Sequence, residues 1–245
     1  MPKYKNQNGQ GLIEFALIIA MLAVTSILAL NLMGVSIQEA YAKIVAAITG
    51  DNLCQTYYAN SFDNNLDDWK RLNPRGFWKG NFKIKDGQLI GDPFGALMLN
   101  QYSGSDYLIN ITDPQLQQTN TTWNGYGVIF RADYDKKDRL DGYMFEVEKV
   151  DKNDPGLMYF SKWENGYQIK PPLSAVKVPP NFDWNKPGDL SVSVQGNTFT
   201  AYLNGEKVLE TQDNTYDAGK VGIAVNAGSK LFLNDFGIDD IVCKE

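Results

Sequence analysis

The chain has 245 residues, with 23 basic and 29 acidic side chains and no histidine, so its formal net charge at neutral pH is −6. An acidic chain is a poor match for nucleic acid, whose phosphates require a basic surface. The absence of histidine excludes Ser-His and Cys-His nucleophilic systems and the usual catalytic zinc sites. We therefore do not expect an enzyme, since any chemistry would have to use carboxylates, tyrosine or lysine.

The N-terminal part combines a short polar leader with a long apolar run. The run extends from Phe15 to Leu30, and one carboxylate, Glu14, stands at its start. About 20 apolar residues suffice to span a bilayer, and a carboxylate in hydrocarbon costs roughly 2.5 to 3.5 kcal/mol, so Glu14 needs a partner. The pattern predicts an apolar helix over residues 10–50, which would anchor the chain in a membrane. A secretory signal cleaved after Ala42 and a simple membrane anchor are the alternatives.

The residues around Gly9 carry a resemblance to a known family. The sequence Gly-Gln-Gly-Leu-Ile-Glu-Phe over residues 9–15 resembles the processing site of type IV pilins, and most closely the tight-adherence (Flp-type and TadE-like) pilins. The resemblance implies that a prepilin peptidase removes a leader of residues 1–9 and exposes a new amine on Gln10. Glu14 would then pair with the Gln10 amine of a neighbouring subunit during assembly.

This resemblance implies a structural subunit of an extracellular type IV pilus, with the helix as the filament core. The implied partners are other copies in a helical homopolymer, prepilin peptidase, the inner-membrane assembly machinery and the membrane itself before assembly. The implied location is the cytoplasmic membrane and then the pilus on the cell surface. Two alternatives stay open: a membrane-tethered, lectin-like module that binds surface glycans, and a minor pilin or adhesin outside the filament body.

The region 51–245 predicts a second domain, an all-β sandwich. Short runs rich in Val, Ile, Tyr, Phe and Thr alternate with Gly, Asn and Asp turns. Pro171-Pro172 and Pro179-Pro180 predict a surface loop between strands. Tight hairpins are expected where a residue pair tolerates positive φ, at Asp86-Gly87, Asn165-Gly166 and Asn204-Gly205.

Five stretches of this region resemble the concanavalin A-like, laminin-G-like jelly-roll domains. They are Phe62 to Trp69, Gly125 to Arg131, Gly142 to Phe145, Tyr202 to Gly205 and Phe236 to Val242. The resemblance implies a concanavalin-like jelly roll behind the long N-terminal helix. It implies little about ligands, because these stretches are mostly turn and core signals.

Two cysteines, Cys54 and Cys243, bracket the predicted sandwich. In a translocated domain the expected arrangement is one disulfide that joins the two ends, and two buried thiols are the alternative.

Candidate ligand sites in the sandwich come from aromatic and acidic residues. Four side chains could share one sheet face as a platform for sugar rings, although core positions fit them equally well: Tyr126, Arg131, Tyr143 and Trp163. Asp63 and Asp235 resemble acids that hold a structural Ca²⁺ at the sandwich edge in related domains. No other cofactor is expected.

Glu146 and Glu148 lie two residues apart, so on a strand both side chains point to one face. Glycosidases of the laminarinase type carry a Glu-x-Asp-x-(x)-Glu pattern on such a strand, whereas here the next acid after Glu148 is Asp151. We therefore expect a solvated outer face rather than hydrolysis. The acidic and basic residues between Asp133 and Asp141 predict a charged hairpin tip.

Overall fold

The computed structural model describes residue 21 and residues 55–63, 65–74, 78–119, 122–151 and 153–241. The predicted leader, nearly all of the predicted helix over 10–50, and both cysteines lie outside these residues, and so do the predictions made for Gly9, Gln10, Glu14, Cys54 and Cys243. Across the described ranges, no helix has both the length and the apolar character that a membrane crossing requires.

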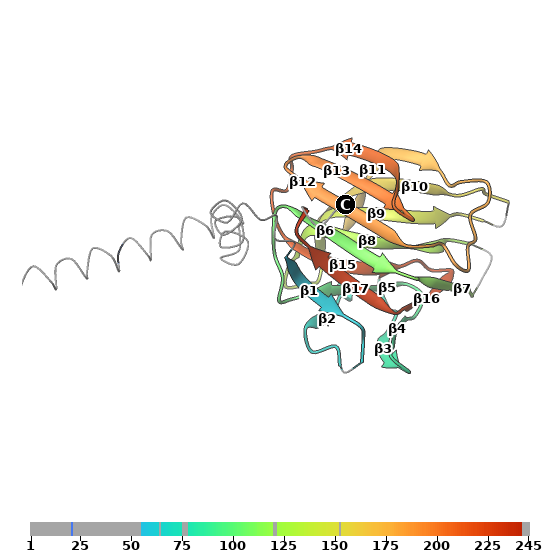
Figure 1. Ribbon diagram of the computed structural model, residues 1–245, viewed down its shortest axis with the longest axis horizontal. Helices are drawn as coiled ribbons and strands as arrows, with labels where there is room; N and C mark the ends of the chain where they lie inside the picture. The colour runs from blue at the N-terminus through green and yellow to red at the C-terminus, as the bar shows by residue number, and fades with distance from the viewer. Residues whose placement is uncertain are drawn as a thin grey trace, which may run out of the picture.

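The described residues form three antiparallel sheets, two of which pack face to face as a jelly-roll sandwich (Figure 1). The seven-stranded sheet runs in the order β11 (Tyr167–Lys177), β10 (Leu157–Glu164), β9 (Leu140–Lys149), β8 (Asn124–Tyr134), β15 (Lys220–Val225), β5 (Gly95–Leu99) and β2 (Trp69–Arg71). The six-stranded sheet runs in the order β1 (Thr56–Asn60), β17 (Asp235–Asp239), β6 (Tyr107–Thr112), β12 (Leu190–Gln195), β13 (Thr198–Leu203) and β14 (Glu206–Gln212). The four-stranded sheet runs in the order β3 (Phe82–Lys85), β4 (Gln88–Gly91), β16 (Ser229–Leu233) and β7 (Gln115–Gln118). The predicted all-β sandwich is confirmed.

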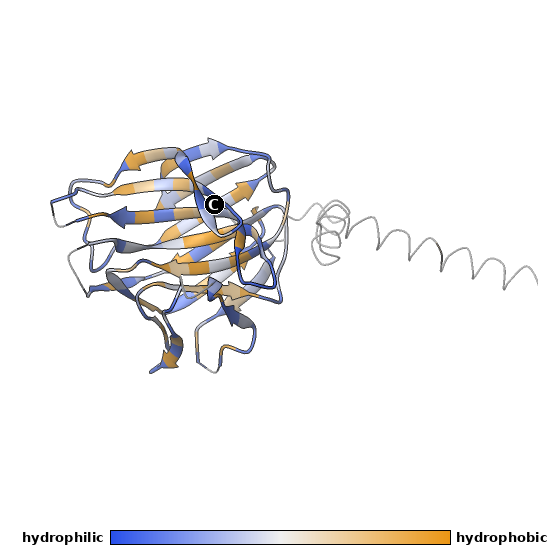
Figure 2. Cartoon of the chain, turned by 180° about the vertical axis from the view of Figure 1, so that it is seen from behind, coloured by the Kyte–Doolittle hydropathy of each residue, from blue (hydrophilic) through white to orange (hydrophobic). Residues whose placement is uncertain are grey.

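The core lies between the two large sheets and is strongly aromatic. Phe130 of β8 and Tyr143 of β9 stack with ring centroids 5.4 Å apart, and Phe199 of β13 packs edge-on to Phe130 from the opposite sheet at 5.0 Å. All three side chains are fully buried. Because side chains alternate along a strand, the neighbours of these core residues point to the other face of their sheet. Figure 2 shows strands that carry apolar and polar positions side by side.

The three predicted hairpin turns are confirmed. The pairs connect β3 to β4, β10 to β11, and β13 to β14, and every residue in them has positive φ, namely Asp86, Gly87, Asn165, Gly166, Asn204 and Gly205. The charged hairpin tip between β8 and β9 is also present, where the Asp135 carboxylate and the Arg139 guanidinium form an ion pair of 2.6 Å. Local turn chemistry therefore sets these connections.

The prediction of a loop through Pro171-Pro172 is wrong, because both prolines lie inside β11. This strand is the edge of its sheet, and among the described strands none pairs with its outer side. A proline that lacks an N–H group on that side therefore costs no hydrogen bond between strands. The pairing also shifts there, since Ile169 faces Lys162 while Ser174 faces Phe160, and the residues between them bulge. An edge position and a bulge together accommodate residues that a central strand would exclude.

Candidate functional site

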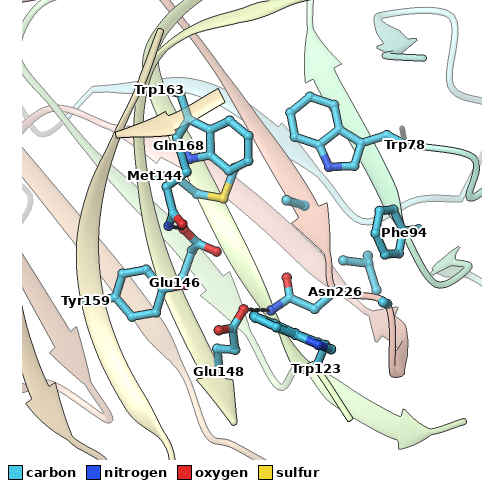
Figure 3. Close-up of a pocket in the computed structure, with 13 residues that line it drawn as sticks. Trp78, Phe94, Trp123, Met144, Glu146, Glu148, Tyr159, Trp163, Gln168 and Asn226 are labelled. Carbon is cyan, nitrogen blue, oxygen red and sulfur yellow. Dashed lines mark hydrogen bonds between the residues drawn. The ribbon is translucent and has the colours of Figure 1, made fainter. Parts of the chain in front are cut away.

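A cavity of about 310 Å³ lies on the face of the seven-stranded sheet that points away from the core (Figure 3). On β9, Tyr143, Phe145 and Val147 enter the core, so the alternate residues project into this cavity. The described residues that line it are Trp78, Phe94, Trp123, Met144, Glu146, Glu148, Tyr159, Trp163, Gln168, Ala224, Val225, Asn226 and Ala227.

Two glycines of β8 lie beside the carboxylates of β9. Gly127 of β8 lies opposite Glu146 in the β8–β9 register, and Gly125 lies opposite Glu148. A Cβ at Gly127 would come within 2.9 Å of the Met144 Sδ atom, and one at Gly125 would collide with the Val147 carbonyl oxygen. Gly127 therefore leaves room for the Met144 side chain, and Gly125 permits the close approach of the β9 backbone.

Five aromatic rings form the walls. Trp163 and Tyr159 come from β10, whereas Trp78, Phe94 and Trp123 come from connections between strands. The Trp78 and Trp163 rings pack at a centroid distance of 5.4 Å, and Trp123 stands at the rim with 49% of its surface exposed. Backbone bonds fix this rim residue, because the Trp123 amide donates to the Val150 carbonyl at 2.8 Å.

Glu146 lies at the end of a short hydrogen-bonded chain. Its Oε1 atom accepts from the Ser161 hydroxyl at 2.7 Å and from the Gln168 amide at 2.9 Å. The Trp163 indole N–H donates in turn to the Ser161 oxygen at 3.1 Å. The Glu146 side chain is only 4% exposed, and this burial raises the pKa of its carboxyl above the usual range. These hydrogen bonds fix the Glu146 carboxylate and the Trp163 ring, which both face the cavity.

Glu148 is partly buried and accepts from the Asn226 amide at 2.7 Å (Figure 3). Burial, and then the charge of Glu146, raise the pKa of Glu148 to about 7, although the Tyr159 hydroxyl and the Lys170 charge oppose the shift. Burial also raises the pKa of Tyr159, so that this phenol stays protonated near neutral pH. Glu148 can thus hold or release a proton near neutrality.

The structure corrects the prediction of a solvated face for these acids. Glu146 and Glu148 do share one face of β9, as expected, but both line the cavity. The sequence contained one overlooked signal: Gly125 and Gly127 alternate on the strand that pairs with them, and glycine inside a strand often marks a close approach of a ligand or of another backbone. No local signal identified the loop aromatics Trp78 and Trp123, since they approach the cavity only through the fold.

The four residues predicted as a sugar platform do not share a face. Tyr126 and Tyr143 are fully buried in the core between the sheets. Arg131 is 3% exposed and forms an ion pair of 3.3 Å with Asp106, while its Nε donates to the Ser105 carbonyl at 2.9 Å. Trp163 alone of the four lines the cavity. Strand alternation separates it from the two tyrosines.

The two acids predicted to hold Ca²⁺ lie at exposed positions. The Asp63 carboxylate accepts from the Ser61 hydroxyl at 2.6 Å, and Asp235 begins β17. Over the part of the chain that the structure describes, no group of three or more His, Cys, Asp or Glu side chains could hold a metal ion. Among the described residues, Asp63 and Asp235 therefore do not belong to such a group.

The architecture defines a class of jelly-roll domains that occurs in carbohydrate-binding modules and β-glucanases. It matches the carbohydrate binding module CBM66 from Bacillus subtilis with a TM-score of 0.53 and 23% identity, over 70% of this chain and 96% of that one. It matches the catalytic domain of an endo-1,3-beta-glucanase (laminarinase) from Thermotoga petrophila RKU-1 with a TM-score of 0.54 and 11% identity, over 76% and 98%. For the endo-beta-1,3-glucanase from Pyrococcus furiosus the TM-score is 0.52 and the identity 11%, over 76% and 94%. At these identities the likeness establishes the fold.

Residues 58–235 match the family of the 3-keto-alpha-glucoside-1,2-lyase-like domain, and the chain belongs to this family. No curated protein matches the chain.

These findings correct the interpretation of the chain as a pilin subunit, which is wrong. The family match covers the sandwich, and both the family and the similar structures bear names of proteins that act on or bind carbohydrates. A helical homopolymer, prepilin peptidase and the pilus assembly machinery accordingly fall away as partners. The alternative made from the same sequence, a lectin-like module, fits these findings better. The pilin interpretation depended on residues 9–15, whereas the family match rests on residues 58–235.

Proposed function

We propose that the domain binds a carbohydrate in the cavity over β8, β9, β10 and β15, and that it does not change the ligand chemically. The observation that carries this proposal is the combination of aromatic walls with two anchored carboxylates in one cavity. A sugar ring presents apolar C–H faces and polar hydroxyl edges. The aromatic rings offer flat apolar surfaces, and the carboxylates accept hydrogen bonds from hydroxyl groups.

The size of the cavity favours a small ligand. Pockets for small molecules usually measure about 300 to 1,000 Å³, and this one measures about 310 Å³. A monosaccharide or the end of a glycan chain fits this volume better than a long internal segment. Membership of the family and the fold shared with CBM66 support a carbohydrate as the ligand. The extracellular location stays a prediction.

Trp123→Ala tests the proposal with little risk to folding, because this ring is half exposed at the rim. We expect the variant to weaken sugar binding about tenfold, which corresponds to about 1.4 kcal/mol. The measurement is calorimetric titration of the full chain with glucose, fructose and β-1,3- and β-1,4-linked glucose disaccharides. Tyr167→Ala is the matched control, since Tyr167 is 70% exposed on β11 and does not line the cavity. If no sugar binds, or if both variants behave alike, the proposed site is wrong.

Acid–base chemistry on a glycoside is the second candidate function, and the protonation of Glu148 favours it. A group whose pKa is about 7 can donate and accept a proton at neutral pH. The family description names a lyase that acts on 3-keto-α-glucosides. Incubation of the full chain with a 3-keto-α-glucoside, with product analysis, separates the two functions. Turnover that Glu148→Gln abolishes would replace binding by catalysis as the function of this cavity.

A further inference from the structure

The described lining of the cavity carries charge of one sign. Among the described lining residues only Glu146 and Glu148 are ionisable as anions near neutral pH, and none is a lysine or arginine. A neutral sugar offers hydroxyl groups to such a cavity, but it brings no positive charge to the two carboxyl groups. Burial of like charges side by side is unfavourable unless a positive group joins them.

We propose that the cavity prefers an amine-bearing sugar over the neutral sugar of the same shape, with the ligand's ammonium group held between the aromatic rings and the two carboxylates. This inference rests on the carbohydrate binding proposed above and names the class of sugar.

The side-chain geometry suits an ammonium group. Glu146 and Glu148 project from alternate positions of β9 into the same cavity, and Asn226 and Gln168 hold them from opposite sides (Figure 3). A carboxylate has about four lone-pair positions, so these bonds leave capacity for a ligand. An ammonium group offers three donors and one positive charge, which matches two neighbouring carboxylates.

The aromatic walls favour the same ligand. The faces of Trp, Tyr and Phe rings attract cations, with Trp the strongest, and the attraction grows where water is excluded. Trp78, Trp123, Trp163, Tyr159 and Phe94 surround the space above the carboxylates. Rings that stack on a neutral sugar thus attract an ammonium substituent in addition.

Charges around the cavity set how binding depends on pH. The groups that act on Glu148 are Glu146 from the same strand, Tyr159 from β10, Lys170 from β11 and Asp154 from the β9–β10 connection. Lys170 is the one cation among them, and it does not line the cavity. Because an ammonium group favours the ionised carboxylates, its binding should release protons and should tighten as the pH rises from 5.5 to about 6.5, where a sugar amine still keeps its proton. Binding of a neutral sugar should depend on pH much less.

The test is calorimetric titration of the full chain at pH 5.5 and 6.5 with methyl glucosaminide, methyl N-acetylglucosaminide and methyl glucoside. We expect the amino sugar to bind at least tenfold tighter than both neutral sugars at pH 6.5, with proton release. Glu148→Gln should remove this preference, and Glu146→Gln should do so independently if the first variant folds poorly. Glu164→Gln is the control, because Glu164 is an exposed acid at the end of β10 outside the cavity.

The outcomes separate this inference from the proposed function. Equal affinity for amino and neutral sugars would overturn the preference while carbohydrate binding stands. Absence of binding by all three sugars would overturn both. Tetramethylammonium, added as a probe, should bind weakly; if it binds as tightly as the amino sugar, the site is a cation cage and the assignment to a sugar is wrong.

Discussion

Replacement of Glu148 by glutamine should make the protein more stable at alkaline pH, because the wild-type carboxyl is buried beside Glu146. The pKa of Glu148 is about 7 in the folded chain, against 4.5 for the free group. Between these values the folded chain holds a proton that the unfolded chain has lost. The free energy of unfolding therefore falls as the pH rises through this window.

The magnitude follows from the shift in pKa. Each unit corresponds to about 1.4 kcal/mol, so the displacement lowers the free energy of unfolding by about 3 kcal/mol between pH 4.5 and pH 8. Burial raises the pKa of Glu146 as well, which acts in the same direction. Glutamine keeps an oxygen that can accept from Asn226 and carries no charge. We therefore expect Glu148→Gln to lose most of this pH dependence.

Urea denaturation of the full chain at pH 5, 6, 7 and 8 measures the effect. Wild type and Glu164→Gln should lose stability across the series, whereas Glu148→Gln should change much less and exceed wild type at pH 8. Parallel pH profiles for wild type and Glu148→Gln would refute the reasoning, because they would mean that water already solvates the Glu148 carboxylate.

Three further changes probe the packing around the site. Gly127→Val should lower the free energy of unfolding by about 1 to 3 kcal/mol, since a Cβ there enters the space of the Met144 side chain; an unchanged melting temperature would mean that this side chain can move aside. Arg131→Ala should cost about 1 to 3 kcal/mol in urea denaturation, because it removes the buried guanidinium that donates to the Ser105 and Tyr216 carbonyls. Ser161→Ala should raise the pKa of Glu146 further, since it deletes a donor to the carboxylate. If infrared titration of the carboxyl band finds the same pKa in both proteins, the hydrogen bond from Ser161 does not stabilise the carboxylate.

Local patterns predicted much of the fold because the relevant physics is local. The pair Asn204-Gly205 forms its hairpin because both residues adopt positive φ. The two-residue spacing placed Glu146 and Glu148 on one face correctly. Pro171 was misread, since the sequence does not reveal that β11 lies at an edge, where a missing amide is tolerated.

The candidate site was harder to predict because it assembles residues that are far apart in the chain. Trp78, Trp123 and Asn226 line the cavity of the two carboxylates from three separate connections. Strand periodicity does not describe which connections lie over a sheet face. Residues that were expected to lie together can also be separated by the fold. Tyr126 and Trp163 had the same expected role, but they point to opposite faces of one sheet.

A crystal structure of the chain in complex with a bound sugar tests the central claim most directly. The account predicts density for the sugar in the cavity, stacked on Trp123 or Trp163 and hydrogen-bonded to Glu148. A sugar bound instead in the polar groove of the six-stranded sheet, beside Asn110 and Asp239, would contradict it.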